Sequence, residues 1–225
     1  MAIQVSRPIQ SVGVRNYYPR AKRVMDVAIA IGLLLVFGVA MLLIMMCIWL
    51  DSEGPIFYKS KRVGADGVEF EMLKFRSMTH RCDDAAHRQA VSKFMNGQSI
   101  GDPKSTSGEY KLAHDPRITR IGHFIRRTSL DELPQLWNVL RGDMSMVGPR
   151  PPVPYEVTMY NSRAWLRLAG KPGLTGPWQV YGRSTVPFDE MVEMDISYLH
   201  SQSLLYDLKL MVLTAPAMIS GRGAG

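Results

Sequence analysis

The sequence has few cysteines and lacks the common phosphate-binding and hydrolase motifs. Its two cysteines, Cys47 and Cys82, are too few for a disulfide framework, which favours a reducing compartment. There is no Walker phosphate loop, no Gly-x-Gly-x-x-Gly and no Gly-x-Ser-x-Gly. These absences argue against nucleoside triphosphate hydrolysis, dinucleotide binding and serine hydrolase chemistry. The five histidines show no metal-ligand spacing, and the chain has no internal repeat.

Acidic residues are missing from residues 1–23, which carry five basic ones. The whole chain has a net charge of +7, which favours an anionic partner such as nucleic acid, acidic lipid or a phosphorylated substrate. No nucleic-acid-binding motif occurs, and the basic residues cluster near an apolar run. We therefore expect membrane lipids or a phosphorylated substrate, and no nucleic acid, as partners.

Charge is also missing from residues 27–50, which form a continuous apolar run. As a helix these residues would extend about 36 Å, enough to cross a hydrocarbon core of about 30 Å. No small-residue cleavage site follows, so a signal peptide is not expected. We divide the chain into a basic tail (1–23), a membrane anchor (24–50) and a membrane-associated domain (51–222), in which any catalytic residues would lie.

The flanks of the anchor predict its orientation. Basic residues also follow the run, at Lys59, Lys61 and Arg62, so the positive bias is nearly symmetric. A re-entrant helix, which enters one leaflet and returns, has such symmetric flanks, and a straight span with a short N-terminal tail is the alternative. No proline interrupts the run, so Gly32 and Gly38 are its weak points for a bend.

Hydrophobic periodicity and turn residues predict an α+β fold that is mostly helical. The predicted elements are two strands (55–63 and 68–78) with a hairpin turn (64–67), a polar helix and loop (79–113), and helices within 130–140, 191–199 and 204–219. The last helix contains Asp207 and Lys209, and its apolar residues suit either a membrane surface or the core. The insertion 79–113 receives no functional assignment.

The strongest local cluster of polar residues is Asp131 and Glu132, which follow Arg126 and Arg127. Pro134 predicts a helix that begins near residues 129–131, with both carboxylates in its first turn. A structural interpretation makes Ser129 and Glu132 a capping box. In a functional interpretation, the helix N-terminus keeps the aspartate ionised and binds a phosphate, and the carboxylate attacks phosphorus to form an acyl phosphate. The local pattern leaves both interpretations open.

Phosphate chemistry next to two carboxylates needs positive charge. Arg150 lies between Pro149 and Pro151, and a guanidinium with restricted backbone suits two phosphate oxygens. Mg²⁺, held by carboxylates and phosphate oxygens, would offset the remaining negative charge. Asp195 and Asp207 interrupt apolar helix faces, so each is either a structural ion pair or a site residue.

Five segments together closely resemble the bacterial sugar transferases called monotopic phosphoglycosyl transferases. They are KRVMD at 22–26, KFRSM at 74–78, TSLDELPQLWNV at 128–139, RGDMSMVGPRP at 141–151 and KPGLTGPWQV at 171–180. The resemblance covers roughly residues 20–222. It implies transfer of a sugar 1-phosphate from a UDP-sugar, a hexose such as glucose or galactose, to undecaprenyl or another polyprenyl phosphate, with release of UMP.

The resemblance also implies roles for single residues. Asp131 would be the nucleophile and hold Mg²⁺, Glu132 would complete the acidic pair, and Arg126 would orient it. The implied substrate-binding residues are Pro149, Arg150 and Asp207, with Arg183 a weaker match. The family's re-entrant anchor and amphipathic interfacial helices would place the catalytic domain on the cytosolic face of a bacterial inner membrane. A homo-oligomer is compatible with the sequence.

Two features leave alternatives to this interpretation. Members of the family commonly have a Ser-Pro pair in the middle of the anchor, where this chain has Phe37-Gly38-Val39, so a straight span stays open. The acids also suit direct attack by polyprenyl phosphate with a carboxylate as base. Outside enzymology, a membrane-tethered binding or scaffold protein would use the basic surface for lipid and the acids as a helix cap.

Overall fold

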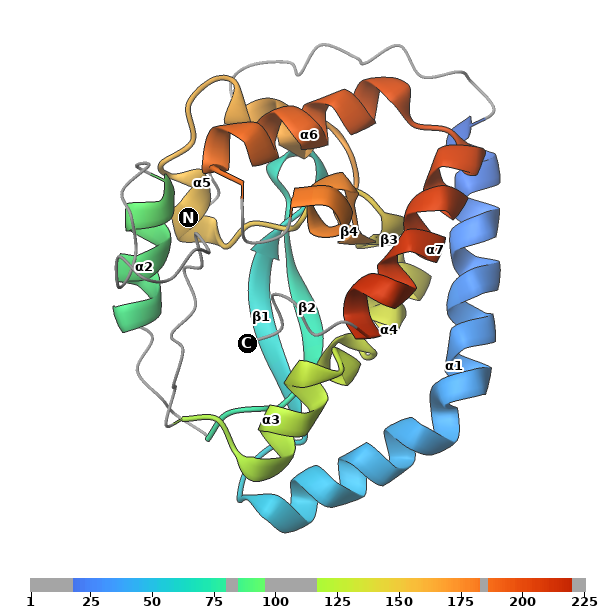
Figure 1. Cartoon of the computed structure of the whole chain (residues 1–225), viewed down its shortest axis with the longest axis vertical. Coiled ribbons are helices and arrows are strands. Elements are labelled where there is room, and N and C mark those ends of the chain that lie inside the picture. The colour runs from blue at the N-terminus through green and yellow to red at the C-terminus, as the bar shows by residue number, and fades with distance from the viewer. Residues whose placement is uncertain (1–17, 80–84, 96–116, 183–185, 220–225) are drawn as a thin grey trace.

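The computed structural model describes residues 18–79, 85–95, 117–182 and 186–219, with helices around a two-stranded hairpin (Figure 1). Its α-helices are α1 (Tyr18–Asp51), α2 (Ala85–Met95), α3 (Arg120–Arg127), α4 (Gln135–Arg141), α5 (Pro154–Val157), α6 (Phe188–Ser201) and α7 (Leu204–Ile219). The strands are β1 (Phe57–Val63), β2 (Glu69–Phe75), β3 (Ser145–Val147) and β4 (Gly173–Thr175). Shorter helical turns are η1 (Ala65–Gly67), η2 (Leu130–Glu132), η3 (Ala164–Ala169) and η4 (Trp178–Gly182). These elements agree with the predicted α+β class.

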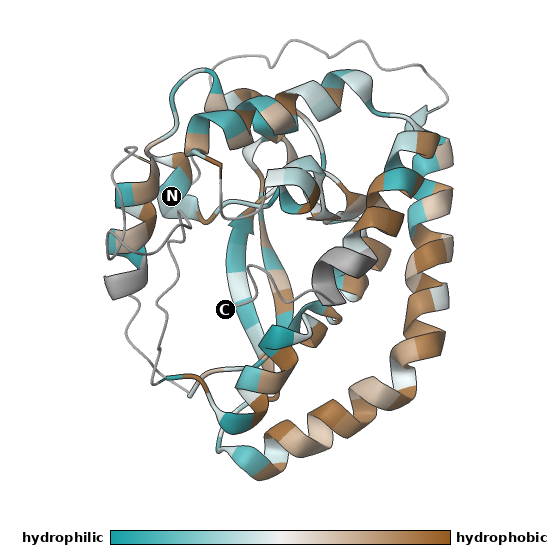
Figure 2. Cartoon of the chain, viewed as in Figure 1, coloured by the Kyte–Doolittle hydropathy of each residue, from teal (hydrophilic) through white to brown (hydrophobic). Residues whose placement is uncertain are grey.

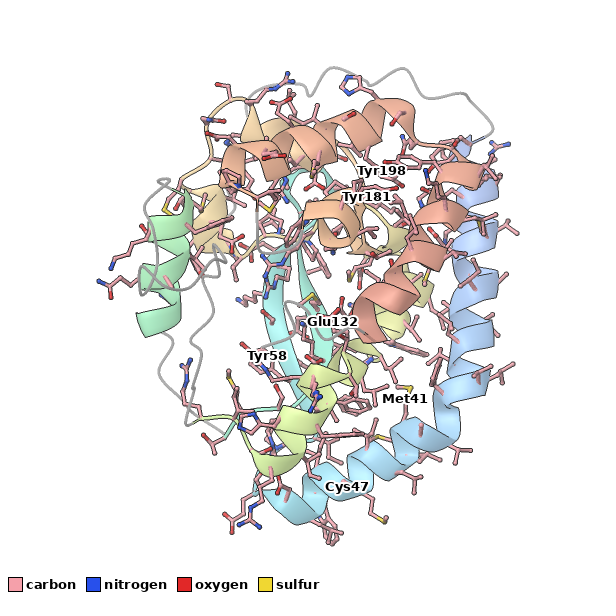
Figure 3. All side chains as sticks on the ribbon, viewed as in Figure 1. Met41, Cys47, Tyr58, Glu132, Tyr181 and Tyr198 are labelled. Atoms are coloured by element: carbon pink, nitrogen blue, oxygen red, sulfur yellow. The ribbon has the colours of Figure 1, made fainter. Side chains whose placement is uncertain are left out.

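Helix α1 is the predicted anchor, and it is bent into two arms rather than straight (Figure 1). Met41 lies beside the bend in Figure 3, three positions after Gly38. Within the described residues, α1 is the one helix that is long and apolar enough to cross a membrane. The helix begins at Tyr18 and so includes part of the segment that we assigned to the basic tail.

Most of α1 is apolar, as Figure 2 shows, and several of its large apolar side chains are exposed. Leu35 is 78% exposed, and Trp49 and Leu50 are each 68% exposed. The first arm packs on α4, β3 and α7, and the second arm packs on α3. Both ends of the anchor are therefore attached to one folded body, while its outer side has no protein cover among the described residues.

The β1–β2 hairpin forms where the sequence predicts it. The strands are antiparallel, with Phe57 opposite Phe75 and Val63 opposite Glu69. In the connecting turn Asp66 and Gly67 have φ values of 55° and 79°, which short polar residues and glycine tolerate best. Both strands are shorter at their outer ends than the predicted ranges.

Strands β3 and β4 form a short parallel pair that the periodicity does not predict. Ser145 lies opposite Gly173, and Val147 lies opposite Thr175. A Cβ atom on Gly173 would lie 2.0 Å from the backbone nitrogen of Gly148, so the two chains approach too closely for any side chain there. The pair brings together the RGDMSMVGPRP and KPGLTGPWQV segments.

The two C-terminal helices confirm the predicted apolar sides. Helix α6 buries Met191, Val192, Ile196 and Leu199. Helix α7 has two different sides, because Asp207 and Leu210 are fully buried while Leu205 and Val212 are 78% and 70% exposed. Core packing and an exposed apolar surface, which we treated as alternatives for this helix, thus occur together.

Candidate active site

A tight turn positions the two acids between α3 and α4. Ser129 has a left-handed conformation with a φ of 55°, and the 3₁₀ turn η2 then contains Asp131 and Glu132. The predicted helix start near residues 129–131 is confirmed as a 3₁₀ turn that has both acids in its first turn, whereas the α-helix α4 begins only at Gln135, after Pro134. The predicted capping box is wrong, since the Ser129 side chain makes no cap hydrogen bond. The left-handed Ser129 lies between α3 and the acids, while Leu133 and Pro134, between the acids and α4, keep helical backbone angles.

The two acids share a lysine from the hairpin. Lys74 of β2 places its Nζ 2.7 Å from Glu132 Oε1 and 3.9 Å from Asp131 Oδ2. Asp131 is 8% exposed, whereas the side chain of Glu132, labelled in Figure 3, is more open. The polar centre therefore has one shielded carboxylate, one accessible carboxylate and one ammonium group.

The electrostatics of Asp131 differ from the prediction that a helix end keeps it ionised. Burial raises the pKa of the Asp131 carboxyl above its ordinary value, and the negative charge of Glu132 adds to the rise. The positive charges of Lys74 and Arg126 lower the same pKa and offset part of this rise. Water solvates this carboxylate poorly, so its charge depends on the two basic side chains.

Asn138 holds the hairpin beside the acidic turn. It is fully buried in α4, its Nδ2 donates to the Glu71 carbonyl at 2.7 Å, and its Oδ1 accepts from the Leu73 backbone at 2.9 Å. These bonds replace part of a strand ladder and fix β2 against α4. Lys74 follows Leu73 directly, so the clamp sets where its ammonium group lies.

The acid pair is the part of the site with ligands that suit a metal. Among the described residues, no group of three or more histidine, cysteine, aspartate or glutamate side chains could hold an ion. Mg²⁺ commonly uses one or two carboxylates, and substrate phosphates and water complete its coordination. Asp131 and Glu132 fit that smaller donor set.

Arg150 lies in a second cluster of positive charge, on the loop after β3. Burial raises the pKa of the Tyr155 hydroxyl, the negative charge of Glu156 adds to the rise, and the positive charges of Arg62, Arg150 and Arg88 oppose it. We call these three arginines the arginine cluster. Arg88 lies over the Tyr155 ring, 5.6 Å from its centroid. The α2 segment of the unassigned insertion thus contributes to this cluster.

The loop of Arg150 is fixed by its neighbours. The Pro149 carbonyl accepts from the Gly173 backbone at 2.9 Å, and the Pro152 carbonyl accepts from the Val63 backbone at 2.9 Å. Pro149 itself is buried. The loop therefore joins β1 to the β3–β4 pair.

The hairpin relates the arginine cluster to the acids. Lys74 lies opposite Tyr58, and Arg62 is four residues further along β1 on the same face. At about 3.3 Å per residue the two positions are roughly 13 Å apart along the strand.

The two late acids are in buried networks. Asp195 pairs with Arg167, whose Nη2 is 2.6 Å from Asp195 Oδ2, so the predicted ion pair with a core arginine is confirmed. Asp207 accepts from Tyr18 at 2.7 Å and from Tyr198 at 2.6 Å, and it pairs with Lys22 at 2.9 Å.

Of the predicted site residues, Asp131, Glu132 and Arg126 come together. Arg150 belongs to the arginine cluster, and Pro149 precedes it in the same loop. Asp207 belongs to the α1–α7 network, and Arg183 lies outside the described residues. The substrate-binding roles of these four residues stay predictions. Sequence reasoning missed Lys74, although the pattern contained a signal. Lys74 lies on the same strand face as Phe70 and Met72, so it places a charge on an otherwise apolar side of β2, where a charged residue needs a partner.

The fold and the site define an α+β protein that has one long apolar helix and a polar centre in which two carboxylates lie beside a lysine. The family model described as "Bacterial sugar transferase" matches residues 17–221. The chain belongs to the bacterial sugar transferase family.

Three similar proteins differ in length. The galactosyl transferase CpsE of Streptococcus agalactiae is 42% identical over 205 residues, which are 91% of this chain and 43% of that protein. The exopolysaccharide production protein ExoY of Rhizobium meliloti is 39% identical over 219 residues, 96% of this chain and 93% of that protein. The undecaprenyl-phosphate galactose phosphotransferase of Salmonella typhimurium is 39% identical over 203 residues, 90% of this chain and 41% of that protein. This chain thus matches nearly all of ExoY but less than half of the other two.

Proposed function

We propose that this protein transfers a sugar 1-phosphate from a UDP-sugar to undecaprenyl phosphate, or a similar polyprenyl phosphate, and releases UMP. Family membership and the name of the Salmonella relative support this reaction. The names of two relatives favour galactose as the sugar. The name of ExoY supports a role in exopolysaccharide production, and we place the reaction at the first membrane step of exopolysaccharide or glycoconjugate assembly.

The observation that carries the proposal is the shielded carboxylate of Asp131 beside Lys74 and Glu132. An Asp131 oxygen attacks the phosphorus that carries the sugar, and the bond from that phosphorus to the bridging oxygen breaks. UMP leaves with the bonding electron pair, and an aspartyl phosphosugar forms. An oxygen of polyprenyl phosphate then attacks the same phosphorus and releases the Asp131 carboxylate.

The charges around Asp131 suit this step. A poorly solvated carboxylate is a stronger nucleophile than a hydrated one, while Lys74 and Arg126 keep a fraction of it ionised. The arginine cluster is roughly 13 Å away along β1, within the length of a UDP-sugar. Arg150 could therefore bind a different part of the donor from the part that reacts.

Mg²⁺ is the cofactor that we propose, held by Asp131 with Glu132 beside it. When bound, the ion would neutralise charge on the diphosphate. The two carboxylates alone fill few coordination positions, so the donor's phosphate oxygens would have to supply others. Binding of the ion would then depend on the substrate.

The bent anchor supports a re-entrant topology. Tyr18 and Lys22 at its start bond to Asp207, and Ser52 just after its end bonds to Arg76 of the same folded body. A helix whose two ends dock on one body has both ends on the same side of a bilayer. UDP-sugars are cytosolic, so we place the body on the cytosolic face of a bacterial inner membrane.

The decisive experiment compares the wild type with Asp131→Asn in detergent or nanodiscs. With Mg²⁺, UDP-galactose and undecaprenyl phosphate, the wild type should release UMP, and Asp131→Asn should release none because an amide cannot replace the nucleophile. Chelation by EDTA should stop the wild type. Asp66→Asn, at an exposed turn position with a positive φ that asparagine tolerates, is the matched control and should keep full activity.

Trapping separates this mechanism from the alternatives. Incubation of the wild type with UDP-galactose alone should add the mass of one galactose phosphate to the peptide that contains Asp131. Turnover without this adduct would favour direct attack by polyprenyl phosphate. Full turnover by Asp131→Asn would refute the nucleophile, and no UMP release by the wild type with any UDP-hexose would favour a scaffold protein.

A further inference from the structure

Helix α3 presents one exposed face of unusual composition. Arg120, His123, Phe124 and Arg127 are all exposed, and their i, i+3, i+4, i+7 spacing puts them on one side of the helix. Phe124 is 59% exposed. We call these four residues the α3 stripe. It places an aromatic ring between two arginines on the protein surface.

The opposite side of α3 shows why the stripe faces outward. Ile125 is fully buried, and a Cβ atom on Gly122 would lie 2.0 Å from the carbonyl oxygen of Ser77. Gly122 therefore lets the helix pack closely on the chain after β2. This packing fixes the rotation of α3, so the stripe cannot turn inward.

The stripe has excess positive charge. Helix α3 contains three arginines and no acid. Neither Arg120 nor Arg127 forms an ion pair with any residue in the described ranges. Two guanidinium groups that have no ion-pair partner among the described residues favour an anionic partner.

Helix α3 also lies directly on the membrane anchor. The Ile121 backbone donates to Asp51 at the end of α1, at 3.3 Å, and Ile125 packs with Ile44 and Ile48 of the second arm. Trp49 of this arm is exposed. Packed helices have axes about 8–10 Å apart, and each headgroup layer is roughly 5–8 Å thick. If the second arm lies in the hydrocarbon, α3 lies at headgroup depth.

We propose that the α3 stripe binds anionic phospholipid headgroups. The two arginines would contact headgroup phosphates, and Phe124 would lie at the boundary with the acyl chains, where amphipathic helices with aromatic residues bind. A second copy of this chain is a poorer partner, because a two-fold contact through the stripe would bring like charges together. The proposal goes beyond the transfer reaction and does not depend on it.

The test measures lipids that accompany the full-length protein out of a membrane. Cells that contain phosphatidylethanolamine and phosphatidylglycerol are treated with styrene–maleic acid copolymer, and the lipids in the purified discs are quantified. The wild-type discs should contain more phosphatidylglycerol, relative to phosphatidylethanolamine, than the parent membrane. Arg120→Gln/Arg127→Gln should return to the parent ratio, since each arginine near an anionic surface contributes roughly fivefold in local affinity.

Two further variants separate binding by the stripe from effects of folding and of net charge. Lys93→Gln/Arg163→Gln removes the same charge from exposed positions on α2 and beside η3, and it should keep the wild-type enrichment. Arg120→Glu/Arg127→Glu should lower phosphatidylglycerol below the parent ratio. Equal enrichment in the wild type and the Arg120→Gln/Arg127→Gln variant, or equal loss in the Lys93→Gln/Arg163→Gln control, would overturn the proposal. Absence of UMP release would leave this result unchanged.

Discussion

Asp131 is subject to opposing influences that the structure makes visible. Burial and the neighbouring charge of Glu132 raise its pKa, while Lys74 and Arg126 lower it. A single change at either neighbour therefore alters the fraction of Asp131 that is ionised, without touching the nucleophile. This makes the pH dependence of turnover a direct test of the geometry.

Lys74→Gln and Glu132→Gln should move the acid limb of the pH profile in opposite directions. The proposed nucleophile must be deprotonated, so kcat/KM should fall as the pH drops through the raised pKa of Asp131. Loss of the Lys74 charge raises that pKa further and moves the limb to higher pH, and kcat should also fall about 10²-fold because a charge that stabilises the transition state is lost. Loss of the Glu132 charge moves the limb to lower pH. UMP release measured across pH gives both profiles.

The control for this prediction is Lys59→Gln on β1. Lys59 also pairs with a glutamate, at 3.1 Å, but both side chains are more than half exposed, so the pair contributes little. Its profile should match the wild type. Two limbs that shift in the same direction would contradict the proposed charge arrangement.

At the scale of elements, hydrophobic periodicity predicts those helices and strands that pack one apolar side against the core. The hairpin, α6 and α7 form where alternation or helical spacing places apolar residues on one side. The late start of α4 could not be predicted, because the backbone from Leu133 to Trp137 makes i→i+3 bonds of the 3₁₀ type. The left-handed backbone of Ser129, which separates α3 from the acidic turn, could not be predicted either, since serine rarely adopts that conformation. The β3–β4 pair could not be predicted from a local sequence pattern either. It depends on the close approach of Gly148 and Gly173, which lie far apart in the sequence.

The site, like the fold, could be predicted only where its residues are close in sequence. Asp131, Glu132 and Arg126 are close in sequence, and the structure brings them together. Lys74 reaches them only because Asn138 clamps β2 to α4, a tertiary contact that the sequence pattern does not contain.

The two arms of α1 allow a test of topology. In a chain with Cys47 and Cys82 replaced by serine, Arg20→Cys and Glu53→Cys each place one exposed thiol at one end of the anchor. In intact spheroplasts a membrane-impermeant maleimide should label neither position, and after permeabilisation it should label both. Labelling of Arg20→Cys alone in intact spheroplasts would show a straight span instead.

At the scale of the whole molecule, buried polar bonds tie the anchor to the catalytic body. Arg23 donates to the carbonyl oxygens of Val139 and Leu140 at the end of α4. Asp26 accepts from the Ser145 hydroxyl at 2.8 Å, which reaches β3. The anchor is therefore part of the folded core, with contacts on several elements.

Lys22→Met should destabilise the protein strongly, by about 3–5 kcal/mol, because it leaves the charge of fully buried Asp207 without its ion-pair partner. The double variant Lys22→Met/Asp207→Leu should recover part of the loss, since it removes the unpaired charge as well. Thermal unfolding in detergent, followed by circular dichroism, measures both. Lys59→Met, at an exposed position, is the control and should unfold like the wild type.

The Lys22–Asp207 bond also constrains how a ribosome can deliver this protein to the bilayer. The two residues are 185 positions apart, so the first arm of the anchor emerges long before its last polar partner exists. Until α7 has been synthesised, Lys22 and Tyr18 must be satisfied by water or by lipid headgroups. Stable seating of the N-terminal helix therefore waits for the C-terminal one, and membrane insertion and folding end as a single event.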